Sequence, residues 1–273
     1  MHALAGNLFY WPCFYQPIQL LVMIQGFLLG FTAYAKAARM VSRHGLWGYV
    51  LVPGLISLLL GSAILSGAWA ISDDISGWAM ALYPFEWGKG AIERIIQVFG
   101  GAMVIILGLL AFKHLVMAIT SPVMSLLSEK VEKILRGGQP QSAAFSIRKA
   151  LSDLARGLAL ALRNLLRELG YTALLLLLGL LLPFLSPAIT LLIFMVQAYY
   201  AGFGNLDFTM ERYFDVKGSV TFAKSNRGLC LGNGTAFLLL LFTGLGFLFA
   251  LPLGTIAATI EGLKALDKQG SPS

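Results

Sequence analysis

Several charged and polar side chains stand directly beside long apolar stretches of the chain. Arg163, Arg167 and Glu168 precede an uncharged run from 169 to 206, and Arg227 precedes another from 228 to 260. An arginine suits an oxyanion because its planar fork offers several donors and keeps its charge. Singly, such residues are ordinary anchors and salt bridges at a membrane surface, but together they can line a polar route. The candidate anion-binding or pore residues are Arg163, Arg167, Glu168, Glu129, Glu132, Ser121, Asn226 and Arg227.

Within this set, Arg163 and Arg167 are the first candidates for attracting an anion. We expect Glu129, Glu132 and Glu168 to hold these arginines in place. Four prolines are expected to shape the helices, namely Pro122, Pro183, Pro187 and Pro252.

Motifs for enzymatic chemistry are missing from the sequence. The three histidines are far apart, and no H-E-x-x-H, C-x-x-C, G-x-S-x-G or G-x-x-x-x-G-K-[ST] pattern occurs. His114 beside Lys113 is interpreted as a snorkelling pair at the membrane surface. Cys13 and Cys230 imply no disulfide framework. We therefore expect no metal, no cofactor and no catalysis, and an intramembrane enzyme is the weakest of the hypotheses.

The composition shows what kind of elements must carry these residues. Of 273 residues, 58% are hydrophobic and only 12% are charged, with a net charge of +7 and a mean hydropathy of +0.78. Soluble domains average about 25% charged residues. The sequence therefore predicts an integral membrane protein whose main partner is the lipid bilayer. In so apolar a chain, the basic excess indicates membrane topology rather than nucleic acid.

The charges fall in blocks that predict a topology. The blocks 36–43 (+3) and 113–168 (9 basic, 4 acidic, so +5) belong in the cytoplasm by the positive-inside rule, and 73–94 (2 basic, 4 acidic, so −2) belongs outside. A helix over 47–71 then spans outward, and the segment 92–120 returns. Because the apolar pattern continues without a break, we expect one long helix that runs on until Gly137-Gly138.

The two later uncharged stretches are short for two spans each. Residues 169–206 contain Pro183 and Pro187, and removing that turn leaves arms of roughly 25 Å, against about 30 Å of hydrocarbon. Residues 228–260 are tighter still, with Pro252 and glycines available for a bend. Both are interpreted as hairpins that penetrate the bilayer partly or barely span it, and an alternative for 228–260 is one long tilted span. Such hairpins need cover, so we expect a homo-oligomer.

The complete fold prediction is an all-α integral membrane protein with two full transmembrane helices, two proline- or glycine-tipped hairpins and cytoplasmic amphipathic helices. The amphipathic helices are expected at 24–43 and from 147 onward, where the second merges into the first hairpin. Residues 1–22 are interpreted as an apolar extension of unknown role, 23–268 as one membrane domain, and 269–273 as a disordered tail.

Three segments resemble the CysZ family of bacterial sulfate permeases, which is grouped with the etoposide-induced membrane-protein domain. They are the run from Ile119 to Gly137 with its Ser-Pro, Leu-Leu and two glutamates, the run from Arg163 to Tyr171 before the proline-tipped hairpin, and 226–234 with its glycines. The resemblance covers roughly residues 23–265. It implies two spanning helices and two part-penetrating hairpins in an oligomer of the bacterial inner membrane, which takes sulfate into the cytoplasm without nucleotide hydrolysis.

One position departs from that family. Where the family has a Gly-hydrophobic-Arg-Arg loop to hold sulfate, this chain has Gly45, Leu46, Trp47 and Gly48, so the arginine pair is absent. Arg43 and His44, just before the loop, are the candidates to replace it. We therefore expect a permease for sulfate or a related oxyanion. The rival hypothesis is a membrane scaffold or assembly protein that transports no solute.

Overall fold

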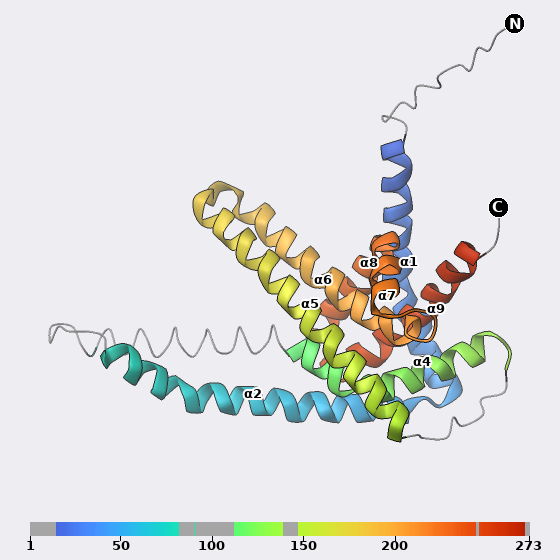
Figure 1. Ribbon diagram of the computed structural model, residues 1–273, viewed down its shortest axis with the longest axis horizontal. Coiled ribbons are helices and arrows are strands. Elements are labelled where there is room, and N and C mark those ends of the chain that lie inside the picture. Colours follow the sequence, from blue (N-terminus) through green and yellow to red (C-terminus); the bar gives the residue numbers. More distant parts are fainter. Residues whose placement is uncertain (1–14, 82–89, 91–111, 139–146, 244–245, 271–273) are drawn as a thin grey trace, which may run out of the picture.

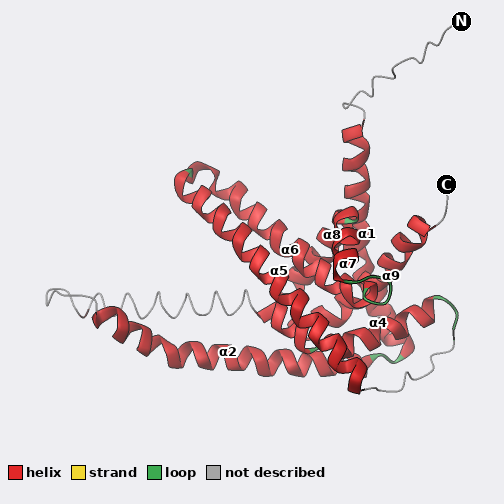
Figure 2. Cartoon of the chain, in the orientation of Figure 1, coloured by secondary structure: helices red, strands yellow, loops and turns green. Residues whose placement is uncertain are grey.

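The computed structural model describes residues 15–81, 90, 112–138, 147–243 and 246–270, and this part of the chain is helical without strands (Figures 1 and 2). A short helical segment at 112–119 directly precedes α4. The elements are α1 (Tyr15–His44), α2 (Trp47–Ala81), α4 (Ser121–Leu135), α5 (Ile147–Leu181), the 3-10 turn η1 (Pro183–Leu185), α6 (Ser186–Met210), α7 (Val216–Ser225), α8 (Arg227–Leu241) and α9 (Phe247–Gly270).

Five of these helices contain segments long and apolar enough to cross a membrane. They are Gln19–His44, Trp47–Gly67, Ala150–Leu181, Pro183–Met210 and Leu248–Gly270. In the first four, only 17–22% of the most apolar window is buried inside the protein, against 72% in the last. Four helices therefore present apolar surface outward, as a lipid-facing helix does, and α9 forms the centre. The predicted all-helical membrane fold is confirmed.

The first hairpin lies where the prolines predict it. The chain turns at Pro183–Leu185, and α5 and α6 run side by side to that tip (Figure 1). Pro183 and Pro187 occupy first-turn positions, where a missing backbone N–H costs nothing. The arms have 35 and 25 residues, longer than predicted, because both helices extend beyond the uncharged run 169–206 into the charged segments on either side of it. How deeply this hairpin enters the bilayer stays a prediction.

The second predicted hairpin consists of α8 and α9. Helix α8 ends at Leu241, α9 begins at Phe247, and Asn233 Nδ2 donates to Gly254 O at 3.0 Å, which ties the two helices together. One continuous span over 228–260 is therefore excluded. Pro252 lies inside α9, as a shaping residue rather than at the turn itself.

The long helix expected from 92 to 136 is wrong in one respect: it breaks at Thr120. Pro122 has no N–H for the carbonyl of Ala118, and Ser121 Oγ lies 2.8 Å from that oxygen and replaces the missing donor. A new helix, α4, starts at Ser121 and ends as predicted before Gly137, which has a φ of 72°. The part of the predicted span at 91–111 lies outside the described residues.

The amphipathic segments are confirmed as helices, with different bounds. Helix α1 already begins at Tyr15, upstream of the predicted start at residue 24, and buries Ala33, Ala37 and Val41. Helix α5 runs unbroken into the hairpin as predicted. Its apolar residues Leu151 and Leu158 are exposed, so its apolar stripe faces outward.

The closest helix packing in the described part of the chain is that of α8 against α1 on one side and α6 on the other. A Cβ added at Gly232 would lie 2.0 Å from Phe27 O of α1, and one at Gly234 would lie 1.7 Å from Ala198 O of α6. Only glycine permits backbones to approach this closely. Asn233 between them accepts from Tyr34 through its carbonyl at 3.0 Å and from Asn205 at 2.8 Å, which links α1, α6, α8 and α9.

Candidate functional site

A basic cavity lies between α5, α6 and the junction of α7 with α8. It has a volume of about 580 Å³, and four of its lining residues are cations. They are Arg163 and Arg167 of α5, Lys224 of α7 and Arg227 of α8. We call this cavity the basic pocket. Three of its four cations are sequence-predicted site residues, brought together from segments 60 residues apart.

Helix geometry positions these cations. Arg163 and Arg167 are one turn apart on α5, so both face the same side. Helix α7 is capped at its start by Asp215 and ends at Ser225. The next residue, Asn226, has a φ of −112° and a ψ of 41°, which separates α7 from α8 between Lys224 and Arg227. Arg227 Nε then donates to Lys224 O at 3.0 Å.

Asn226 itself does not line the pocket. Its side chain Nδ2 donates to Phe222 O at 2.9 Å and so secures the end of α7. Its position therefore fixes the junction that carries Lys224 and Arg227.

Among the residues that the structure describes, no carboxylate lines the basic pocket and its four cations form no ion pair. Arg163 donates instead to the neutral amide oxygen of Asn164 at 2.9 Å. Like charges one helical turn apart repel, so the arrangement is more stable with an anion between them. The chemistry of the pocket is that of an anion site.

The glutamates predicted to hold Arg163 and Arg167 have other partners, and the prediction is corrected here. Glu168 is 1% exposed and lies 2.6 Å from Lys113 Nζ and 2.9 Å from His114 Nε2. Helix periodicity explains this, since one residue of separation turns Glu168 about 100° away from Arg167 and into the protein. Lys113 and His114 are likewise buried, 4% and 3% exposed, so they are no snorkelling pair at the membrane surface.

The glutamates of α4 belong to a separate charged cluster. Glu132 Oε2 accepts from Arg212 Nη2 at 2.8 Å, and its other oxygen accepts from Arg136 Nε at 3.0 Å and from Tyr213. Burial opposes ionisation of Glu132, but the hydrogen bonds from Tyr213 and Arg212 outweigh it and hold its pKa below the usual value. Glu129 pairs with Lys133 one turn along at 2.9 Å. This cluster joins α4 to the end of α6 and does not reach the basic pocket.

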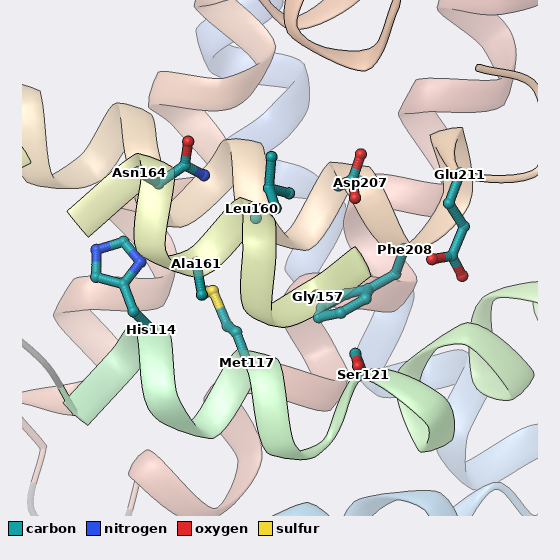
Figure 3. Close-up of a pocket in the computed structure, with 11 residues that line it drawn as sticks. His114, Met117, Ser121, Gly157, Leu160, Ala161, Asn164, Asp207, Phe208 and Glu211 are labelled. Atoms are coloured by element: carbon teal, nitrogen blue, oxygen red, sulfur yellow. The ribbon is translucent and has the colours of Figure 1, made fainter. Parts of the chain in front are cut away.

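Ser121 lines a second, much smaller cavity between the 112–119 segment, α5 and α6 (Figure 3). His114 and Asn164 lie at one end of it, and Asp207 and Glu211 lie at the other. The volume of about 20 Å³ is close to that needed for one water molecule. A five-atom oxyanion is too large for this cavity, whereas the basic pocket has room for one.

Glu211 lies just after the candidate span that ends at Met210. Its Oε1 is buried without a hydrogen-bond partner in the described part of the chain. Burial raises the pKa of Glu211 to about 7, and the hydrogen bond from Ser125 and the nearby guanidinium of Arg156 offset this only in part.

The loop at the family's sulfate position is a tight turn between α1 and α2. Gly45 has a φ of 61°, Leu46 is fully buried, and Trp47 is half exposed. A Cβ at Gly48 would meet nothing within 4 Å. Arg43 and His44 lie in the last turn of α1, both exposed, and neither lines the basic pocket.

Sequence reasoning missed Lys224, which lines the basic pocket beside the predicted arginines. A signal was available, because Lys224 stands three residues before Arg227, just as Arg163 stands four before Arg167, each pair ahead of an uncharged stretch. It also missed the pairing of Lys113 and His114 with Glu168, for which the sequence offers no local signal.

The fold and the pocket define the class: a multi-pass helical membrane protein with an unneutralised basic cavity between its helices. The family model described as "Sulfate transporter CysZ/Etoposide-induced protein 2.4" matches residues 33–252, and the chain belongs to that family. Similar proteins include the sulfate transporter CysZ of Pseudomonas paraeruginosa (strain DSM 24068 / PA7), 25% identical over 239 residues that cover 85% of this chain and 95% of the relative. Another is the sulfate transporter CysZ of Pseudomonas aeruginosa (strain LESB58), 25% identical over 241 residues that cover 85% of this chain and 96% of that relative.

Proposed function

We propose that this protein is a permease of the bacterial inner membrane that admits sulfate, or a related oxyanion, to the cytoplasm without nucleotide hydrolysis. One observation carries the proposal: four cations from three helices face one cavity, and none of the described residues that line it is a carboxylate. Family membership and the printed names of the relatives support sulfate as the first substrate to test.

Arg163 and Arg167 attract the anion in this proposal, and Lys224 and Arg227 complete its surroundings. Two arginine forks supply donors for the oxygens of a tetrahedral oxyanion, while the lysine adds a compact charge. A focused positive field in a low-dielectric cavity also raises the local anion concentration. The turn at Gly45–Gly48 carries no arginine pair, so recognition rests on the basic pocket instead of on that loop.

The carboxylates play a structural part in this proposal. Glu168 is fully engaged with Lys113 and His114, which joins the 112–119 segment to α5 and keeps a negative charge out of the basic pocket. Oligomerisation is part of the proposal, because the hairpin tips need protein cover in the bilayer.

The test is uptake of labelled sulfate into proteoliposomes that contain the full chain. Arg167→Ala should reduce uptake about tenfold or more, as expected for the loss of a hydrogen bond to a charged group. Arg148→Ala is the matched control, since Arg148 is exposed on the same helix and does not line the basic pocket. The control should retain wild-type uptake.

Uptake no faster than that of empty vesicles, with sulfite and thiosulfate also negative, would refute the permease. That result would favour the rival hypothesis of a membrane scaffold whose charges contact other proteins.

A further inference from the structure

The basic pocket is much larger than one oxyanion. Its volume is about 580 Å³, against about 20 Å³ for the small cavity that has room for about one water molecule. Sites of 300–1,000 Å³ typically hold organic ligands with a mainly apolar surface and a few polar groups. A five-atom anion between the arginines leaves most of this space to something else.

The space beyond the cations is apolar. Leu174 and Leu175 continue the lining along α5, and Leu192 and Met195 face them from α6. At 1.5 Å per residue, the lining extends about 18 Å along α5 from Arg163 to Leu175. The pocket is therefore polar at one end and apolar at the other, over the length of a lipid headgroup and the first part of its acyl chain.

The apolar end opens sideways onto the outer surface of the hairpin. Leu174 and Leu192 both line the pocket and are 64% and 46% exposed. They belong to α5 and α6, whose apolar windows are only 17% and 22% buried inside the protein, so this opening faces the bilayer. Between the two ends lies Tyr171, which is 52% exposed, and tyrosine is typical of the boundary between headgroups and acyl chains.

We propose that the basic pocket seats a phospholipid with an anionic headgroup. Its phosphate lies among Arg163, Arg167, Lys224 and Arg227, and an acyl chain lies along Leu174 and Leu192. Charge complementarity selects the headgroup, because four cations without a carboxylate favour an anionic lipid over a zwitterionic one. The continuous apolar wall selects a lipid over a free anion. Where the proposed function also holds, lipid and oxyanion compete for the same cations, and the lipid regulates uptake.

The test measures lipid retention by the purified full chain in mild detergent, by native mass spectrometry. The probes are dioleoylphosphatidylglycerol and dioleoylphosphatidylcholine, which share their acyl chains and differ in headgroup charge, and glycerol 3-phosphate, which has the phosphate without the chains. The expected result is preferential retention of phosphatidylglycerol, with glycerol 3-phosphate bound far more weakly.

Variants assign this retention to the two ends of the pocket. Arg167→Gln and Arg227→Gln should each weaken phosphatidylglycerol binding about fivefold, the effect of one basic residue near an anionic lipid. Leu192→Trp should fill the apolar end and displace the lipid. The matched controls are Arg148→Gln and Leu191→Trp, exposed neighbours on the same two helices that do not line the pocket, and both should retain the lipid.

Equal retention of the two lipids would overturn the proposal, as would a preference for phosphatidylglycerol that survives both Arg167→Gln and Leu192→Trp. Glycerol 3-phosphate that binds as tightly as the whole lipid would overturn it too, in favour of a free-anion site. The assay needs no flux, so its outcome is separate from that of the permease proposal. If both hold, sulfate uptake should be slower in vesicles of phosphatidylglycerol than in vesicles of phosphatidylcholine.

Discussion

Replacing Glu168 with Gln should destabilise the protein strongly. Glu168 is 1% exposed, and its two oxygens lie 2.6 Å from Lys113 Nζ and 2.9 Å from His114 Nε2. Glutamine keeps the shape of the side chain and removes its charge. The ammonium of Lys113, itself 4% exposed, then has no anion and no access to water.

The magnitude follows from this burial. Removing one partner of a buried ion pair typically costs about 3–5 kcal/mol, because the other charge is left uncompensated. At about 2–4 °C per kcal/mol for a chain of this size class, the midpoint of thermal unfolding should fall by about 6–20 °C. Lys133→Gln is the matched control. Its pair with Glu129 is partly exposed, 35% and 21%, and spans one helical turn, so its loss should cost only about 0.3–0.5 kcal/mol.

The assay is thermal unfolding of detergent-purified protein, followed by the loss of the monodisperse folded species. A double variant, Lys113→Met with Glu168→Gln, should recover part of the loss, since the two charges are then removed together. Equal midpoints for Glu168→Gln and Lys133→Gln would refute the reasoning, because they would mean that the ammonium of Lys113 is stable in this place without a carboxylate.

Two further variants probe other parts of the bundle. Gly232→Ala should destabilise the protein by about 1–3 kcal/mol, because a Cβ there would lie 2.0 Å from Phe27 O. At Gly170 a Cβ would meet nothing within 4 Å, so Gly170→Ala should stabilise α5 by about 0.5–1 kcal/mol. Midpoints of thermal unfolding that move in the same direction for both variants would contradict this packing. The raised pKa of Glu211, about 7 against 4.5 in an unfolded chain, means that the folded state binds more protons between these values. The free energy of unfolding should therefore fall as the pH rises from about 4.5 to 7, by on the order of 3 kcal/mol in all, and Glu211→Gln should flatten that slope in midpoints measured at pH 5–8.

The fold was predictable where local chemistry determines it. Pro183 and Pro187 predicted the turn of the first hairpin, and the short uncharged stretch between 228 and 260 predicted the second hairpin. The break at Thr120 was missed although Ser121-Pro122 is visible in the sequence, because the apolar spacing on either side of it continues in register. The spacing of apolar residues indicates which face of a helix is apolar, but the backbone N–H that Pro122 lacks determines where the helix is interrupted.

The sequence predicted three of the cations of the basic pocket, but it did not predict which acidic and basic side chains form ion pairs. Arg163, Arg167 and Arg227 stand out because charges beside apolar stretches are costly. Which anion or cation each one meets depends on the packing of helices far apart in the chain. Glu168 and Lys113 are separated by 55 residues and adjacent in space, and neither neighbourhood in the sequence indicates the other.

The glycine contact between α1 and α8 also has a consequence for how the protein is made. Tyr34 and Asn233, which bond across it, are 199 positions apart, so at about 5–20 residues per second α1 leaves the ribosome about 10–40 s before its partner exists. Through that interval the face of α1 around Gly26 and Gly30 lacks the helix that covers it in the finished protein. Substitutions on this face are therefore expected to reduce the yield of newly inserted chains, even where the few molecules that mature are stable.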